Sequence, residues 1–194
     1  DEPDDATERS ADVVEKYQIP SVKVTGGQRI DLLGVKKEDL PGVWKDLDMP
    51  SGHAYAKALR TVKTCVGSEW CRFGVQDSTN MGIELERDLW RMYAPHKVKL
   101  AVSGCPRNCA EAGIKDVGVI GVDSGWEIYV GGNGGIKTDV AQFFVKLKTP
   151  AEVLEYSGAF LQLYREEGWY LERTVHYLHR VGMDHVKKRV LDDA

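Results

Sequence analysis

Four cysteines, arranged as two pairs, are the only cysteines in this chain of 194 residues. Five residues separate Cys65 from Cys71, three separate Cys105 from Cys109, and thirty-three lie between the two pairs. Four soft thiolates on two facing loops can hold an iron–sulfur cubane, which takes one anionic ligand for each iron. Thiolates bind zinc as well, although two to four residues usually separate the members of a zinc-binding pair. The spacing alone therefore leaves a cluster and a four-cysteine zinc site as alternatives.

Disulfides and unligated thiols are the two alternatives without a metal. Disulfides would need an oxidising compartment, and the start of the chain has no apolar segment or cleavage signal typical of secretion. Four unligated thiols would not account for the small residues, glycine and proline among them, in the segments TCVGSEWC and SGCPRNC. We therefore predict a cytoplasmic protein in which a metal centre is bound by Cys65, Cys71, Cys105 and Cys109.

Two lysines lie on a predicted strand that leads into the second cysteine pair. Lys97 and Lys99 are two residues apart, so their side chains project from the same face of the strand and their charges repel each other. A solvated strand edge often carries such lysines. A bound anion would offset the repulsion, and the strand runs directly into Ser103-Gly104-Cys105. This proximity to the cysteine loop favours an anion site.

More basic residues flank the cysteines on both sides. They are Arg60 and Lys63 before the first pair, Arg72 directly after it, and Arg107 inside the second pair. A cofactor with many carboxylates would need such a pocket of arginine and lysine. Cations would also compensate the net negative charge of four thiolates around zinc. These residues therefore favour a polyanionic cofactor without excluding zinc.

The composition excludes several classes of protein. Hydrophobic residues at 42% and charged residues at 29% are ordinary for a soluble globular domain. No apolar run is long enough for a membrane helix, and no basic stripe suggests nucleic acid. The net charge of −4 arises at the start, where five of the first eight residues are acidic. That start lacks methionine and is typical of a fragment cut from a longer polypeptide at a linker.

Hydrophobic periodicity predicts an α+β protein in two parts. We expect an acidic linker or tail over residues 1–15 and a ferredoxin-like half domain over residues 16–50, with strands at 21–25 and 29–33 and a helix at 36–48. Residues 51–194 form the second part. Its expected elements are a short helix at 53–59, a helix from about 77 to 95, strands at 97–103, 117–122 and 126–130, and three helices after Pro150 separated at Gly168 and Gly182.

From about Lys16 to its end, the chain resembles the nitrite and sulfite reductase hemoproteins. The segments that carry the resemblance are VKVTGGQRIDLLGVKKEDLP, SGHAYAKALRTVKTCVGSEWCRFGVQDST, AVSGCPRNCAEA, DVGVIGVDSGWEIYVGG and YREEGWYLERT. They are similar to the siroheme-containing C-terminal region of the large subunits of NAD(P)H nitrite reductases. The resemblance implies a ferredoxin-like half domain followed by a siroheme and 4Fe–4S domain.

The resemblance also implies roles for particular residues. The four cysteines match the ligands of the 4Fe–4S cluster, with Cys109 at the position that bridges to the siroheme iron. Positions that bind the anionic substrate are matched by Arg60, Lys97 and Lys99, and siroheme-contact regions are matched by Gln28, Arg72, Arg107 and Asn108. His96 stands where several relatives have arginine, so no role is carried over to it.

The reaction that the resemblance implies is the six-electron reduction of nitrite to ammonia. Sulfite reduction by the same machinery is one alternative, and a non-catalytic zinc module that mediates assembly is another. The chain has no Rossmann fingerprint, so FAD and NAD(P)H are expected in other parts of the full enzyme. Expected partners are therefore a flavin and NAD(P)H domain of the same polypeptide and a small subunit. Related single-chain sulfite reductases repeat this unit twice, which suggests a homodimer here.

Overall fold

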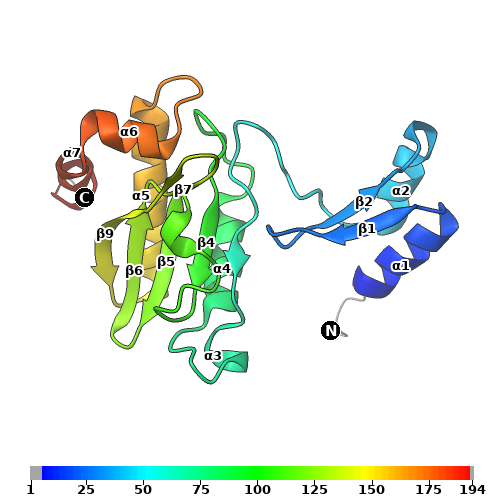
Figure 1. The fold of residues 1–194 in the computed structure, drawn as a ribbon, viewed down its shortest axis with the longest axis horizontal. Helices are drawn as coiled ribbons and strands as arrows, with labels where there is room; N and C mark the ends of the chain where they lie inside the picture. Colours follow the sequence, from blue (N-terminus) through cyan, green and yellow to red (C-terminus); the bar gives the residue numbers. More distant parts are fainter. Residues whose placement is uncertain (1–5, 193–194) are drawn as a thin grey trace. The chain divides into compact units, whose positions relative to one another are not determined.

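The computed structural model describes residues 6–192 and divides the chain into two compact units, Asp1–Gly52 and His53–Ala194 (Figure 1). The first unit contains a β-hairpin and two helices, and the second contains a larger mixed sheet with helices packed against it. Helices and strands are thus mixed in both units, as the sequence predicts. None of the described helices is both long and apolar enough to cross a membrane.

The first unit packs two helices against each other beside a hairpin. Its elements are α1 (Ala6–Lys16), β1 (Ser21–Val24), β2 (Ile30–Leu33), the 3-10 helix η1 (Lys37–Asp39) and α2 (Leu40–Leu47). The two strands pair antiparallel, with Ser21 opposite Leu33. Its small core is formed by Val13, Ile19, Val43 and Leu47. The two predicted strands are confirmed, and the predicted helix is present as η1 followed by α2.

The structure places residues 6–15 in helix α1, where the sequence suggested a linker or tail. Val13 of this helix is buried, and Arg9 donates a hydrogen bond from Nη1 to the carbonyl oxygen of Leu47 at 3.2 Å. Just beyond the helix, the hydroxyl of Tyr17 donates to Asp46 at 2.7 Å. These contacts with α2 order a mostly polar helix whose composition alone is that of a linker. The remainder of the expected linker, residues 1–5, lies outside the described residues.

The second unit is built on a five-stranded sheet. In spatial order its strands are β3 (Lys63–Thr64), β4 (Leu100–Ser103), β5 (Val117–Val122), β6 (Gly125–Val130) and β9 (Gln142–Leu147). Strands β3, β4 and β5 run parallel, while β5, β6 and β9 run antiparallel to their neighbours. A separate two-stranded pair is formed by β7 (Asn133–Gly134) and β8 (Thr138–Asp139). The second cysteine pair therefore follows the carboxyl end of a buried parallel strand.

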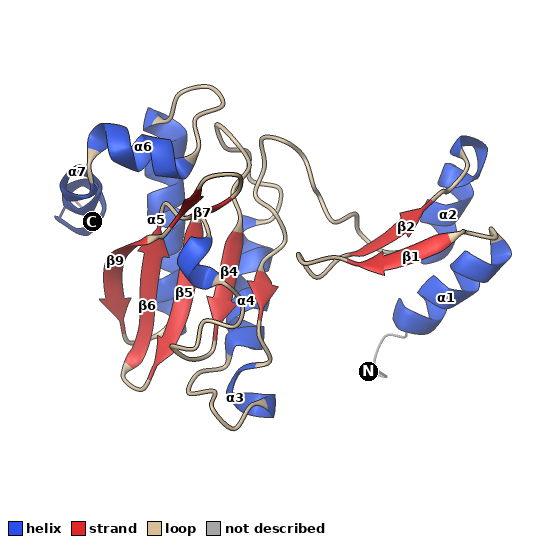
Figure 2. Cartoon of the chain, viewed as in Figure 1, coloured by secondary structure: helices blue, strands red, loops and turns tan. Residues whose placement is uncertain are grey.

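The two faces of strand β4 have different surroundings. Helices α4 (Ser78–Leu89) and α5 (Pro150–Glu167) lie side by side behind the sheet (Figure 2), and their side chains share the main core with Val98, Leu100 and Val102. On the other face, the 3-10 helix η2 (Ala112–Ile114) packs on β4 and β5. Small residues make this packing close, with Ala101, Ala110 and Ala112 in one cluster. One face is thus deep core, and the other is a shallow layer of alanines.

The C-terminal helices follow the predicted breaks. Helix α5 begins with a capping box, in which Thr149 Oγ1 accepts from the Glu152 amide at 3.3 Å and the Glu152 carboxylate accepts from the Thr149 amide at 2.8 Å. It ends before Gly168. Helices α6 (Thr174–Val181) and α7 (Met183–Lys187) meet at Gly182, and the π-helical η3 (Lys188–Asp192) follows. The separation into three helices is confirmed.

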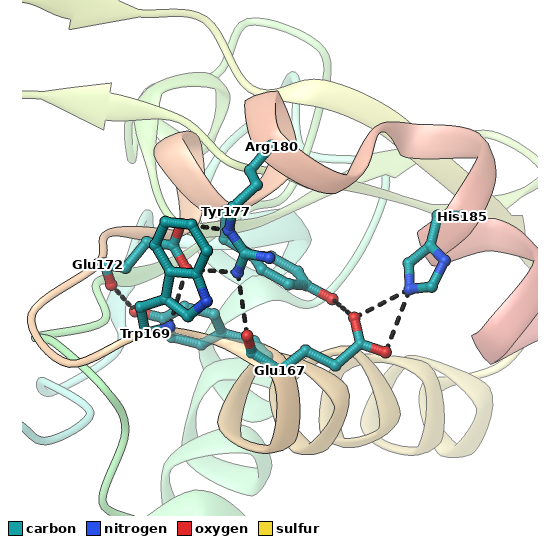
Figure 3. A network of polar contacts seen from close by, with 7 residues as sticks. Glu167, Trp169, Glu172, Tyr177, Arg180 and His185 are labelled. Atoms are coloured by element: carbon teal, nitrogen blue, oxygen red, sulfur yellow. Dashed lines mark hydrogen bonds and ion pairs between the residues drawn. The ribbon is translucent and has the colours of Figure 1, made fainter.

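A polar network holds α6 and α7 against the end of α5 (Figure 3). The carboxylate of Glu167 accepts from the Tyr177 hydroxyl at 2.8 Å and lies 2.9 Å from His185 Nε2. Arg180 donates to Glu172 at 2.7 Å and stacks over Trp169, with its guanidinium carbon 4.1 Å from the ring centroid. The network therefore fixes the segment between Gly168 and α6, which ends at Arg173.

Residues 53–59 do not form the helix that the sequence predicts. Leu59 forms a parallel bridge with Val98 instead, and both side chains are buried. This pairing across 39 positions of sequence outweighs a weak local preference for helix. The next helix is also shorter than predicted, since α4 ends at Leu89 rather than before Pro95. Strand β9 was not predicted.

Candidate functional site

The two cysteine loops are joined through the backbone of Gly104. Its carbonyl oxygen accepts hydrogen bonds from the amides of Val75 and Gln76, at 2.8 and 3.0 Å. Its own amide donates to the sulfur of Cys65 at 3.2 Å. The residue that precedes the second cysteine pair therefore contacts the first pair directly, although 39 positions of sequence separate Gly104 from Cys65.

Glycines allow this close approach of the two loops. A Cβ atom added at Gly104 would lie 2.7 Å from the carbonyl oxygen of Gln76, and one added at Gly74 would lie 2.5 Å from the carbonyl of Gly67. Gly67 itself has a φ of 62°, a left-handed conformation that side chains disfavour. The small residues noted in the sequence around both pairs thus have a structural cause: they let two backbones touch.

The thiol of Cys65 lies within hydrogen-bond distance of two polar groups. Besides the Gly104 amide, the hydroxyl of the buried Ser78 lies 3.2 Å from its sulfur. Burial acts to raise the pKa of the Cys65 thiol, but its hydrogen bonds with Gly104 and Ser78 outweigh this effect and hold the pKa below its usual value. Because the thiolate is the form that binds metals, this environment prepares Cys65 as a ligand.

The other three cysteines differ in exposure. Cys71 is half-buried directly after the short helix α3 (Gly67–Trp70), Cys105 is buried, and Cys109 is exposed. All four thiols are free. Among the described residues, no three His, Cys, Asp or Glu side chains are grouped so as to hold a metal ion as they stand. The loops are thus joined through their backbones, and the four thiols differ in exposure.

Asn108 shapes the second cysteine loop. It has a φ of 56°, a conformation that asparagine tolerates better than most residues. Its main-chain amide donates to the carbonyl oxygen of Cys105 at 3.1 Å, and its side-chain oxygen accepts from the main-chain amide of Gly113 at 3.1 Å. The structure therefore gives Asn108 a role in positioning Cys105 and Cys109, while contact with a cofactor stays a prediction.

Two arginines, one from each loop, meet on one aromatic ring. The guanidinium carbon of Arg107 lies 3.8 Å from the ring centroid of Phe73, and that of Arg72 lies 4.6 Å from it. All three side chains are exposed. Cation–π contacts hold the guanidinium groups in place while leaving their donors open to an anionic ligand. The structure thus brings together two of the residues predicted to bind a cofactor.

A second basic group forms where the segment ending at Arg60 pairs with the segment that carries Lys97 and Lys99, just before strand β4. The Arg60 amide donates to the carbonyl oxygen of Val98 at 2.8 Å, and Leu59 pairs with Val98 in register. Since Leu59 and Val98 point into the core, their neighbours point to the opposite face. That face carries Arg60, Lys97 and Lys99. The structure therefore brings the three predicted catalytic residues together.

The electrostatics of this basic group are visible at Lys99. Partial burial lowers the pKa of Lys99, and the positive charges of Lys97, Lys115 and Arg173 lower it further. The carboxylate of Asp116 acts in the opposite direction. A lysine whose pKa is lowered by neighbouring cations is stabilised in its protonated form when an anion binds beside it. The arrangement is thus that of an anion site.

The two basic groups lie toward opposite ends of strand β4. Lys97 and Lys99 precede the strand, whereas Cys105 follows it. At about 3.3 Å per residue, the four steps from Lys99 to Ser103 cover about 13 Å. Between them, Ala101 is covered by η2. The cysteine loops and the lysine cluster are therefore separate regions on one strand.

Gln28 and three residues absent from the sequence prediction complete the account. Gln28 belongs to the first unit, in the turn between β1 and β2, where its main-chain amide donates to the carbonyl oxygen of Thr25 at 3.0 Å. Its role in binding a cofactor stays a prediction.

Lys115 and Asp116 directly precede β5, and a parallel pairing of the predicted strands 97–103 and 117–122 would have placed them beside Lys99. Arg173 comes from a distant loop and has no such sequence signal.

Comparison with known proteins identifies the family. Residues 55–194 match the "Nitrite and sulphite reductase 4Fe-4S domain", and residues 5–50 match the "Nitrite/Sulfite reductase ferredoxin-like half domain". The chain therefore belongs to the nitrite and sulphite reductase family, and its larger domain is the 4Fe–4S domain of that family. This confirms the predicted fold class, in which a ferredoxin-like half domain precedes the cluster domain.

Individual relatives include both nitrite and sulfite reductases. The chain is 66% identical over 183 residues to the NAD(P)H nitrite reductase of Bacillus subtilis, covering 94% of this chain and 23% of that protein. It is 33% identical to an assimilatory-type sulfite reductase of Nitratidesulfovibrio vulgaris, covering 92% of this chain and 82% of that protein. The chain thus spans less than a quarter of the length of the nitrite reductase that it matches.

Solved structures share the fold. A dissimilatory sulfite reductase I superposes with a TM-score of 0.85 at 17% identity, covering 97% of this chain and 66% of that chain. The Mycobacterium tuberculosis NirA protein superposes with a TM-score of 0.82 at 20% identity, covering 96% of this chain and 38% of that chain. At these identities the likeness concerns the fold alone.

Proposed function

We propose that this chain is the part of an NAD(P)H nitrite reductase large subunit that reduces nitrite to ammonia in a six-electron reaction. The observation that carries the proposal is strand β4, which has the candidate anion site before it and the second cysteine pair after it. The 66% identity to a nitrite reductase favours nitrite as the substrate. The relative named as a sulfite reductase keeps sulfite as a second candidate.

The proposed ligands of a 4Fe–4S cluster are Cys65, Cys71, Cys105 and Cys109. The joined loops and the lowered pKa of the Cys65 thiol suit a metal centre, and the family match to a 4Fe–4S domain favours a cluster over zinc. We further propose that Cys109, which is exposed, would also hold siroheme through its thiolate. When bound, these groups would supply the electrons and the metal site for the substrate.

The side chains of this chain would hold the anions and supply protons. Arg72 and Arg107 are proposed to pair with siroheme carboxylates, together with Gln28 and Asn108. Arg60 would orient the oxyanion substrate through directed hydrogen bonds. Lys97 and Lys99 would stabilise negative charge and donate protons as N–O bonds break. The lowered pKa of Lys99 suits this role, because an ammonium group with a lower pKa gives up its proton more readily.

The proposal is tested by the spectrum, metal content and activity of the purified chain after cofactor loading. We expect siroheme absorption, about four or five irons per chain, and reduction of nitrite to ammonia with reduced viologen as the electron donor. Turnover of sulfite and nitrite is compared under the same conditions. Zinc as the sole bound metal would contradict the proposal, and a clear preference for sulfite would favour the second candidate. In the full enzyme, a flavin and NAD(P)H domain, and a small subunit, would take the place of the viologen.

We further propose that two copies of the chain share their active sites. The separation of Lys97 and Lys99 from the cysteine loops along β4 supports this, since a cofactor at the cysteines of one copy could meet the cations of another. A twofold dimer would form two equivalent sites of this kind. Each site would take its thiolates from one protomer and its cations from the other.

Mixing two inactive variants tests this sharing. After exchange of protomers, Lys97→Met and Cys65→Ser are expected to regain about a quarter of the wild-type activity, because half of the dimers are mixed and each has one intact site. Lys97→Met mixed with Lys99→Met is the control and should regain none, since both lesions affect the same side. No recovery in the first mixture, or full activity in a chain that sediments as a monomer, would contradict the shared site.

A further inference from the structure

Asp116 is a buried carboxylate directly beside the segment that carries Lys97 and Lys99. Its residue is fully buried, and the parallel register that pairs Val117 with Leu100 puts it next to Lys99. The main-chain amide of Lys99 donates to its Oδ2 at 2.8 Å. The carboxylate is therefore hydrogen-bonded to the main chain of Lys99 itself, just outside strand β4.

The same carboxylate holds the residues that begin α6. Arg173 donates from Nη2 to both oxygens of Asp116, at 3.0 and 2.9 Å, and the hydroxyl of Thr174 donates to Oδ1. The Arg173 side chain is only 15% exposed. Asp116 thus links the segment that carries Lys97 and Lys99 with the start of α6, although more than seventy positions of sequence separate them.

This link is an expensive way to join two elements. Removing a carboxylate and a guanidinium from water costs free energy, and an apolar contact of the same size often stabilises a fold as well or better. The location of the pair suggests what the charges do. The positive charges of Arg173, Lys115 and Lys97 all act on Lys99. Arg60 lies on the segment that pairs with Val98, and His96 directly precedes Lys97. Asp116 is the carboxylate that acts on Lys99, while the carboxylate of Glu111 pairs with Lys115 at 2.9 Å.

We propose that Asp116 is a positioning residue for the anion site: it fixes the Lys97–Lys99 segment through the Lys99 amide and holds Arg173 beside it as a further cation. This proposal rests on the proposed function, in which Lys97 and Lys99 act on nitrite. Asp116 itself contacts no substrate. Its negative charge offsets part of the repulsion that the neighbouring cations exert on Lys99, so that the Lys99 ammonium stays protonated and in place before the anion arrives.

Two substitutions with opposite effects test the proposal. Asp116→Asn keeps the shape of the side chain but removes the charge that raises the pKa of Lys99, so the pKa of Lys99 should fall. Arg173→Gln removes a charge that lowers this pKa, so the pKa of Lys99 should rise. Trace labelling of lysine amines across a pH series, followed by mass spectrometry of the peptides, measures the pKa of Lys99 in the folded protein without turnover.

The kinetic consequence is measured on the cofactor-loaded protein. In Asp116→Asn, kcat/KM for nitrite should fall by about a hundredfold, as expected for a displaced catalytic group, and the alkaline limb of its pH profile should move to lower pH. In Arg173→Gln the alkaline limb should move to higher pH. A merely structural role would lower stability in both variants without shifting the pH profile in opposite directions.

Glu172→Gln is the matched control. It removes the ion pair with Arg180 (Figure 3), in the same segment of chain but outside the lysine cluster. We expect a loss of stability with an unchanged pKa of Lys99 and an unchanged pH profile. An unchanged Lys99 pKa in Arg173→Gln and in folded Asp116→Asn would overturn the positioning role. Shifted labelling with an unchanged pH profile would instead overturn the part of Lys99 in nitrite reduction, and leave its positioning by Asp116 standing.

Discussion

Replacement of Cys109 by serine is expected to abolish siroheme binding and to lower nitrite reduction by at least about a hundredfold. Changes to groups that merely support metal ligands already cost up to this factor, and Cys109 is proposed as a ligand itself. A serine hydroxyl is a harder donor than a thiol and is not ionised at neutral pH, so it is a poor substitute for a thiolate on iron. Cys109 is exposed, so the substitution should leave the fold intact.

The measurement combines siroheme absorption, iron content and nitrite turnover with reduced viologen. Pro106→Ala is a suitable control, because Pro106 is exposed in the same loop and offers no ligand atom. It should keep siroheme and most of the activity, which would separate the loss of the thiol from a disturbance of the loop. Full nitrite reduction by Cys109→Ser would contradict the assignment of the shared thiolate.

Local patterns in the sequence predicted the elements that depend on local physics. The alternation of Lys97, Val98 and Lys99 puts the lysines on one face whatever the strand pairs with, because side chains alternate along any strand. A helix was predicted from about residue 77, and it does begin at Ser78, where the carboxylate of Asp77 accepts from the amide of Asn80 at 3.1 Å. The helix breaks at Gly168 and Gly182 were likewise found. Such features are determined within a few residues of the chain.

The errors arose where distant segments decide the conformation. Leu59 is extended because it pairs with Val98, and no local signal shows that pairing. The join between the cysteine loops depends on Gly104, whose contacts lie in another segment, so the glycines indicated close packing without naming its partner. Arg173 reaches the lysine cluster from the loop before α6. The site was thus predictable as a set of residue types, and its supporting residues were not.

The lysine cluster should reveal its function by an opposition between activity and stability. Lys97→Met and Lys99→Met each remove one charge from a repelling cluster while keeping a side chain of similar length, so neither should lower the free energy of unfolding, and a slight increase is expected. Nitrite reduction should nevertheless fall by about a hundredfold or more in each variant, since charge stabilisation and proton donation each contribute factors of that size. Siroheme and iron content should be unchanged.

The two variants also differ in a way that pH reveals. In Lys97→Met, Lys99 loses a neighbour that lowers its pKa, so the pKa of Lys99 should rise. The remaining activity then depends on a lysine that stays protonated to higher pH, and the alkaline limb of kcat/KM should move upward. Lys146→Met, on strand β9, provides a control on the same sheet and should change neither activity nor profile. Wild-type nitrite kinetics in both cluster variants would leave these lysines as counter-charges for the cofactor, and an alkaline limb that stays in place would exclude Lys99 as the proton donor.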